Sequence, residues 1–156
     1  MAATNSDQYG TGIARVGSGE FGSLKVCYGS IEVATAASAA DTINMFTMPK
    51  GFTPLFGYLV GDDIDTGTEA LELDVGVTGD TTKYLNSGVI TGDTIANEKI
   101  TVGIKIPLQE DLMTVKPTEL TADTDCIITV TAAANAGGTG TISVWIAGVY
   151  NDSRVI

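Results

Sequence analysis

Short stretches of alternating apolar and polar residues, separated by Gly, Asn and Asp, recur along this chain and limit the folds open to it. The clearest is Leu71–Val77, in which every second side chain is apolar while Glu72 and Asp74 occupy the positions between. Val, Ile and Thr account for 49 of the 156 residues, and β-branched side chains fit a pleated surface better than a helix. The pattern predicts an all-β domain.

We expect about eight short strands, and one helical turn over Thr81–Leu85 with Asp80 as its N-cap. A bulge at Gly29-Ser30 should interrupt the first strand, and Pro107 should place its strand near an edge or an end of a sheet. Asn135–Gly138 should close a hairpin between the last two strands. The expected strands cover residues 24–33, 42–48, 53–60, 71–77, 89–90, 101–108, 125–132 and 139–150, with a further local pairing segment at 112–115.

Short antiparallel strands with long connections predict a two-sheet antiparallel sandwich, jelly-roll-like, because this is a common arrangement of eight strands. An immunoglobulin-like sandwich is the alternative fold, but its usual Cys, Trp, Cys order is absent because Trp145 follows Cys27 and Cys126. Pro49–Gly51 should form a turn. The expected core includes Leu73, Val75, Ile104, Ile106, Ile128, Val130, Val144 and Ile146.

Residues 1–22 differ from the rest of the chain because they contain five Gly and no sustained apolar period. We expect an extended N-terminal arm over residues 1–22 and a β-sandwich domain over residues 23–156. Either this arm contacts a neighbouring molecule or it folds back over its own sandwich. The residues expected to contact a neighbour are Ile13, Arg15, Val16 and Phe21.

Acidic residues outnumber basic ones by 19 to 8 and give the chain a net charge of −11. A polyanionic surface repels phosphate backbones, so we expect no nucleic-acid partner. No apolar stretch is long enough to span a bilayer, and the first residues lack the pattern of a secretory signal. We therefore expect no membrane association, and synthesis in a cytoplasm.

The chain contains few residues that could form a catalytic or metal-binding site. The chain has no His, and Cys27 and Cys126 lack the spacing that activates a thiol, so two reduced core cysteines are expected, with a disulfide as the alternative. Asp62, Asp63 and Asp65 share one Gly-bounded loop, where they form either a solvated turn or a cation site.

Two further patterns resemble catalytic motifs only superficially. Glu72 and Asp74 project from the same side of one strand, where a solvated pair is a simpler interpretation than a glycosidase pair. Gly137–Gly140 has the glycines of a phosphate loop without its Lys, and should be a turn. We therefore expect no enzymatic activity, no cofactor and no bound metal.

The strands at Pro54–Val60 and Ile142–Tyr150 carry apolar side chains on both of their faces. One outward face should be polar in a lone sandwich, so a second apolar face indicates a surface that is covered, either by another subunit or by a loop of the same chain. The side chains opposite the expected core of the last strand are Trp145, Ala147 and Val149. The residues expected at the contact are Phe56, Tyr58, Trp145 and Val149.

Several phrases of the sequence carry a resemblance to a known group of proteins. They are Gly22–Gly29, Asp41–Gly51, Asp62–Glu69, Leu73–Val77 and Ala132–Gly140. With its spacing of strands and turns, most of the chain resembles the capsid cement, or decoration, proteins of tailed bacteriophages. The resemblance implies a non-catalytic β-sandwich that binds the outside of an assembled capsid, with the major capsid protein as its partner.

A protein of this kind is expected on the outer capsid surface of the virion, where it cements neighbouring capsid subunits. It is also expected to be a homo-oligomer, with a trimer favoured and a dimer as the alternative. The alternative function is a receptor- or glycan-binding module of a phage fibre that uses Tyr58, Tyr84 and Trp145.

Overall fold

The structure, a computed structural model, describes residues 4–5, 14–15, 24–33, 38–61, 71–86, 104–108, 117–132 and 140–150. These residues form ten strands and no helix. The strands are β1 (Thr4–Asn5), β2 (Ala14–Arg15), β3 (Leu24–Val33), β4 (Thr42–Met48), β5 (Phe52–Gly61), β6 (Glu72–Val77), β7 (Asp80–Leu85), β8 (Ile104–Pro107), β9 (Thr124–Ala132) and β10 (Gly140–Tyr150).

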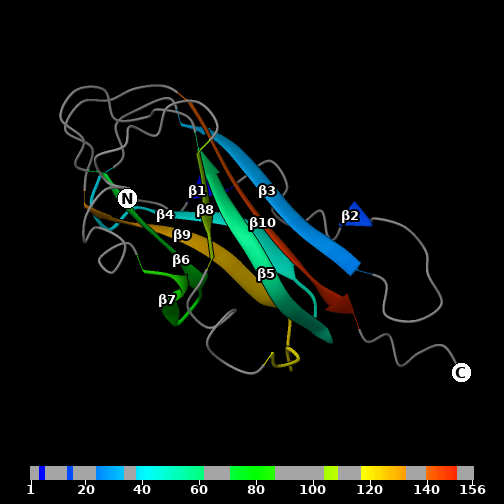
Figure 1. Ribbon diagram of the computed structural model, residues 1–156. Coiled ribbons are helices and arrows are strands. Elements are labelled where there is room, and N and C mark those ends of the chain that lie inside the picture. Colours follow the sequence, from blue (N-terminus) through cyan, green and yellow to red (C-terminus); the bar gives the residue numbers. More distant parts are fainter. Residues whose placement is uncertain are drawn as a thin grey trace, which may run out of the picture.

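The strands form two sheets that pack as layers. Sheet I has the order β1-β4-β9-β6-β7 and sheet II the order β2-β3-β10-β5-β8. In Figure 1, β3, β10 and β5 of sheet II run side by side in front, and strands of sheet I cross behind them. The predicted all-β sandwich is confirmed.

The pairing of the eight strands from β3 to β10 follows one rule. The first pairs with the last (β3 with β10), the second with the second last (β4 with β9), and so on through β5 with β8 and β6 with β7, always antiparallel. A long hairpin rolled up in this way, with its strands shared between two sheets, is a jelly roll. The fold is therefore a jelly roll, as the sequence predicts.

The two shortest strands come from the N-terminal segment. β1 pairs parallel with β4 (Thr4 beside Ile43), and β2 pairs antiparallel with β3 (Arg15 beside Lys25). Each of them adds a short edge to one of the two sheets.

Two predictions about local structure are wrong. β9 and β10 belong to different sheets, so no hairpin joins them; the Gly-rich loop composition indicates a chain reversal but does not specify the sheet that follows. Thr81–Leu85 is a strand and no helical turn, since Gly79, with φ of 92°, closes a tight turn and Asp80 pairs with Val77. A positive φ is readily adopted by Gly.

The predicted bulge at Gly29-Ser30 is also wrong. β3 pairs with β10 without interruption from Leu24 to Val33, and Gly29 is buried opposite Val144 on the inward side. The register shifts lie elsewhere, and one of them leaves Leu55 of β5 without a partner on β10.

Six of the eight predicted core residues are confirmed as buried, with exposed fractions between 0% and 7%. The other two, Ile104 and Ile106, lie on β8, and their side chains fall outside the described set. The core also takes large side chains that alternation did not select, namely Met45, Phe46, Met48, Phe52 and Tyr84.

Two predictions that depend on proline are confirmed. β8 is the edge strand of sheet II, and Pro107 is its last residue, so no ladder hydrogen bond is lost inside the sheet. Pro49–Gly51 forms the turn from β4 to β5, in which the Phe52 N–H donates to the Pro49 carbonyl at 3.1 Å and Gly51 has φ of 88°.

Candidate interaction surface

The outward side of β3, β10 and β5 carries a row of aromatic side chains. Tyr28 of β3, Trp145 of β10 and Tyr58 of β5 are direct neighbours in register, and Pro107 of β8 continues the row. We call this side of sheet II the aromatic face. Its outward positions are Leu24, Val26, Tyr28, Ser30, Glu32, Thr53, Phe56, Tyr58, Val60, Thr141, Ser143, Trp145, Ala147 and Val149.

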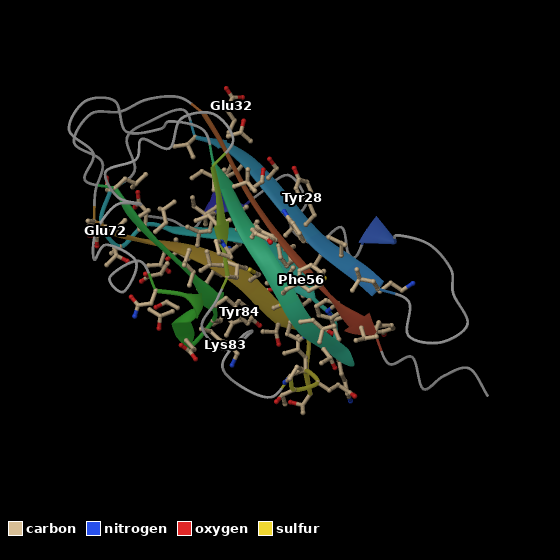
Figure 2. All side chains as sticks on the ribbon, in the orientation of Figure 1. Tyr28, Glu32, Phe56, Glu72, Lys83 and Tyr84 are labelled. Atoms are coloured by element: carbon tan, nitrogen blue, oxygen red, sulfur yellow. The ribbon has the colours of Figure 1, made fainter. Side chains whose placement is uncertain are left out.

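The aromatic rings contact one another across the strands. The ring centroids of Tyr58 and Trp145 are 4.8 Å apart with planes tilted by 38°, and those of Phe56 and Trp145 are 6.1 Å apart and nearly perpendicular, at 80°. Phe56 and Tyr28 remain 43% and 39% exposed, as does Leu24 at 42%. Figure 2 shows Tyr28 on β3 and Phe56 on β5. The rings are therefore tilted against one another and do not form one flat surface, and parts of Phe56 and Tyr28 remain exposed to solvent.

Local features of β5 turn these rings outward. Phe52 and Pro54 face inward before the register shift, and Gly57 and Leu59 face inward after it, so that Phe56 falls on the outward side. Gly57 permits the close approach of β10, because a Cβ at this position would overlap the Trp145 carbonyl oxygen and lie 2.9 Å from Leu108 Cδ1.

A cluster of hydroxyl groups adjoins the aromatic row. Ser30 and Ser143 are paired in register, and their Oγ atoms are hydrogen-bonded at 2.9 Å. Hydrogen bonds from the Ser30 and Ser143 hydroxyls lower the pKa of the Tyr28 phenol, with a smaller opposing effect of burial. The two serines and the Tyr28 phenol therefore form one polar cluster on the aromatic face.

The outward side of sheet I has a different chemistry. Thr47 Oγ1 donates to Asp125 Oδ1 at 2.7 Å, and Thr131 Oγ1 donates to Asp74 Oδ2 at 2.8 Å. Asp74 is only 6% exposed, so the prediction that it forms a solvated pair with Glu72 is wrong for Asp74. Its burial beside a hydroxyl donor fits a structural role.

Both cysteines lie in the hydrophobic core. Cys27 and Cys126 are free and buried, which confirms the predicted reduced core cysteines against the alternative of a disulfide. Burial raises the pKa of the Cys27 thiol to about 12. The pKa of Cys126 is raised chiefly by burial and less by Cys27 and Asp125. Both sulfurs stay protonated and are poor nucleophiles.

The structure brings three of the predicted contact residues together, namely Phe56, Tyr58 and Trp145. Val149 lies farther along β10, half-buried between Leu24 and Thr53 in register. Arg15 lies on β2, and its side chain is not among those described. Ile13, Val16 and Phe21, like Asp62, Asp63 and Asp65, fall outside the described residues.

Sequence reasoning missed Tyr28 and Leu24. Without the expected bulge, the alternation of β3 places them opposite the buried Cys27 and Ile31, so the signal was present in the sequence.

Tyr84, predicted for a glycan site, is fully buried. Within the described ranges, no three acidic or sulfur side chains gather to hold a metal.

No helix in the described part of the chain has the length and apolar character needed to cross a membrane.

No protein-family model matches this chain, and no curated protein matches it. Among solved structures, a chain of the cyanophage Pam1 capsid asymmetric unit is 26% identical with a TM-score of 0.68, over 88% of this chain and 91% of that one. A chain of the Ralstonia phage GP4 capsid structure is 18% identical with a TM-score of 0.66, over 97% of this chain and 100% of that one. The protein thus shares its fold with chains of two phage capsid structures.

Proposed function

We propose that this protein is a non-catalytic virion structural protein that binds the outer surface of a phage capsid and cements neighbouring capsid subunits. The observation that carries the proposal is the aromatic face, whose rings stay partly exposed in the isolated chain. The fold shared with two capsid chains supports it. The net charge of −11 suits a position away from packaged DNA.

Cementing requires contact area rather than reactive groups. Trp and Tyr are frequent hot spots of protein interfaces, and fully burying an exposed Phe is worth about 1.5–3 kcal/mol. Since a symmetric shell presents many equivalent sites, copies that bridge two subunits gain avidity from modest individual contacts.

The test is the binding of purified protein to capsids that lack it, measured by co-sedimentation. Trp145→Ala should lower the occupancy strongly, because a buried aromatic hot spot is worth about 2 kcal/mol or more. Thr81→Ala, on an exposed position of β7 in the other sheet, is the matched control and should bind as the parent does. Equal occupancy of the two variants would exclude the aromatic face as the capsid contact.

The N-terminal arm is the second proposed capsid contact, which it would make through Ile13, Arg15, Val16 and Phe21. Deletion of residues 2–20 tests it, since the sandwich should still fold while capsid binding is lost. The deletion also removes the short pairings of β1 and β2, so circular dichroism and thermal melting must first show that the jelly roll is intact. Occupancy equal to that of the full chain would reject the anchor.

We also propose that the protein self-associates, as a trimer or, in second place, as a dimer. Apolar surface left on a soluble chain favours closed symmetric assemblies. Light scattering coupled to size exclusion measures the mass in solution, and a monomer both in solution and on the particle would contradict the proposal.

A glycan-binding fibre module is the weaker alternative. Stacking of a sugar needs a flat, open ring face, whereas Trp145 is flanked by rings tilted by 38° and 80°, and Tyr84 is buried. Saturable binding of host surface polysaccharide to the isolated protein would revive it.

A further inference from the structure

We propose that the part of the aromatic face formed by Tyr28, Trp145 and Glu32 binds a basic, arginine-bearing segment of the partner protein. This inference deepens the proposed function, because it gives the chemistry of the partner at the same surface. It rests on the register, the exposure and the charge of two neighbouring strands.

The outward positions of β3 and β10 form a strip that has Tyr28 and Trp145 at its aromatic end and Glu32 at its acidic end. Tyr28 pairs with Trp145, Ser30 with Ser143, and Glu32 with Thr141, all on the outward side. Glu32 lies four positions after Tyr28, which corresponds to about 13 Å along a strand. Figure 2 shows Glu32 toward one end of β3 and Tyr28 nearer its middle.

The charge of this strip favours a cation. Glu32 is exposed and is the charged residue among the described side chains of the aromatic face. Lys25 lies on β3 at the opposite parity, and Lys105 of β8 pairs with Val60, three strands away from Glu32. The chain as a whole carries −11, which would attract a basic segment from a distance.

The aromatic end attracts a cation as well. The face of a Trp or Tyr ring carries negative quadrupole potential, and Tyr28 keeps 39% of its surface exposed. Arg suits the strip better than Lys because its planar guanidinium stacks on rings and also forms paired hydrogen bonds with a carboxylate.

Other occupants fit the strip less well. A purely apolar partner would bury the Glu32 carboxylate without a counter-charge, which is costly. A second copy of this chain would bring its own Glu32, and no cation from the described side chains of its aromatic face, to this strip, so we expect the proposed self-association to use other surfaces.

The single Trp of the chain makes the site directly observable, because intrinsic tryptophan fluorescence reports Trp145 alone. The probe is the peptide acetyl-Arg-Gly-Ser-Gly-Arg-amide, whose two Arg have the spacing from Tyr28 to Glu32 in an extended chain. The control peptide replaces both Arg by citrulline, which is nearly isosteric and uncharged. We expect a saturable fluorescence change with the Arg peptide. The citrulline peptide should bind with an affinity that is lower by a factor of about ten or more.

Variants of the full-length protein locate the binding. Glu32→Gln and Tyr28→Leu should each weaken the Arg peptide by about two- to fivefold. Tyr28→Phe keeps the ring and should bind as the parent does, and so should Thr81→Ala on sheet I. Because the three positions are exposed on strands, we expect unchanged melting curves, which serve as the check on folding.

Equal affinity for the two peptides, or unchanged affinity in both Glu32→Gln and Tyr28→Leu, would overturn the inference. A concentration-dependent fluorescence change that accompanies dimer or trimer formation and excludes the peptide would assign the strip to a second copy instead. If Trp145→Ala loses capsid binding but the peptides bind equally, the proposed function stands and this partner chemistry fails. If Trp145→Ala retains capsid binding, the aromatic face is not the capsid contact and this inference fails with it. If the parent protein does not bind capsids, the proposed function itself fails.

Discussion

The outward sides of the two sheets belong to the same sandwich but differ in how their side chains are satisfied. On sheet I, Thr47 and Thr131 donate to carboxylates of neighbouring strands, and Asp74 and Ile127 are each 6% exposed. These two side chains are therefore covered by the chain itself, although Thr131 beside them stays exposed. On sheet II, Tyr28, Phe56 and Leu24 remain about two-fifths exposed. The exposed large apolar side chains therefore lie on sheet II, which supports this sheet as the proposed contact side.

The largest effect should come from comparing an inward with an outward Phe. Phe46 is fully buried in the core that both sheets share, and Phe46→Ala should lower the free energy of unfolding by about 3–5 kcal/mol. Phe56 is 43% exposed on the aromatic face, and Phe56→Ala should cost about 1 kcal/mol or less. Urea unfolding measures both. Similar losses would mean that Phe56 is covered by its own chain.

A methyl group at Gly57 tests how tightly the aromatic face is supported. The added Cβ would meet the Trp145 carbonyl and the Leu108 side chain, so Gly57→Ala should destabilise the fold by about 1–3 kcal/mol. It should also change the near-ultraviolet circular dichroism of Trp145. Gly79→Ala, where the added Cβ has open space but φ is 92°, is the control and should leave that spectrum unchanged.

Two carboxylates on opposite outward sides should differ in their contribution to stability. Asp74→Ala removes the buried acceptor of the Thr131 hydroxyl and should cost about 1–2 kcal/mol in unfolding free energy. Glu32→Ala removes an exposed group of the aromatic face and should change stability by no more than about 0.5 kcal/mol. Equal effects would show that the two sides are not differently satisfied.

A further modest effect concerns the hydroxyl cluster of sheet II. Ser143→Ala breaks the 2.9 Å hydrogen bond to Ser30 and should cost about 0.5–1.5 kcal/mol. It should also raise the pKa of Tyr28 toward its ordinary value, because one of the two hydrogen bonds that lower it is lost. Carbon-13 resonances of the Tyr ring follow this titration. An unchanged Tyr28 pKa would show that Ser143 does not donate to the phenol.

The sign of the pH dependence follows from the same pKa. Tyr28 has a lower pKa in the folded chain than in the unfolded one, so the folded state releases its proton first as the pH rises. The stability that Tyr28 contributes is absent at neutral pH and grows as the pH rises through its folded pKa to its unfolded value. In Ser143→Ala this gain at alkaline pH should shrink.

Much of the fold could be predicted because alternation is a local signal. The stretches that became β6 and β10 alternate clearly, and their inward Val75 and Val144 are fully buried. What failed depended on distant partners. β9 lies between β4 and β6 rather than beside β10, since its pairing is decided by strands far away in the sequence. The register shift at Leu55 likewise arises from the match between β5 and β10.

The candidate surface was predicted in part for the same reason. Phe56, Tyr58 and Trp145 could be identified because they are apolar residues on the outward side of their strands, where polar residues are expected. Tyr28 was missed because the expected bulge at Gly29 hid the alternation of β3. Neither the contact between Tyr58 and Trp145 nor the burial of Asp74 follows from a single strand, because both depend on the neighbours that the fold supplies.

The pairing of the first long strand with the last has a consequence for biosynthesis. Ser30 and Ser143 are 113 residues apart in the sequence and adjacent in the sheet, so β3 must wait for nearly the whole chain to be translated before β10 arrives. Trp145 comes with that final strand. A prematurely terminated polypeptide that ends before β10 therefore lacks Trp145 and the central strand of the proposed contact surface.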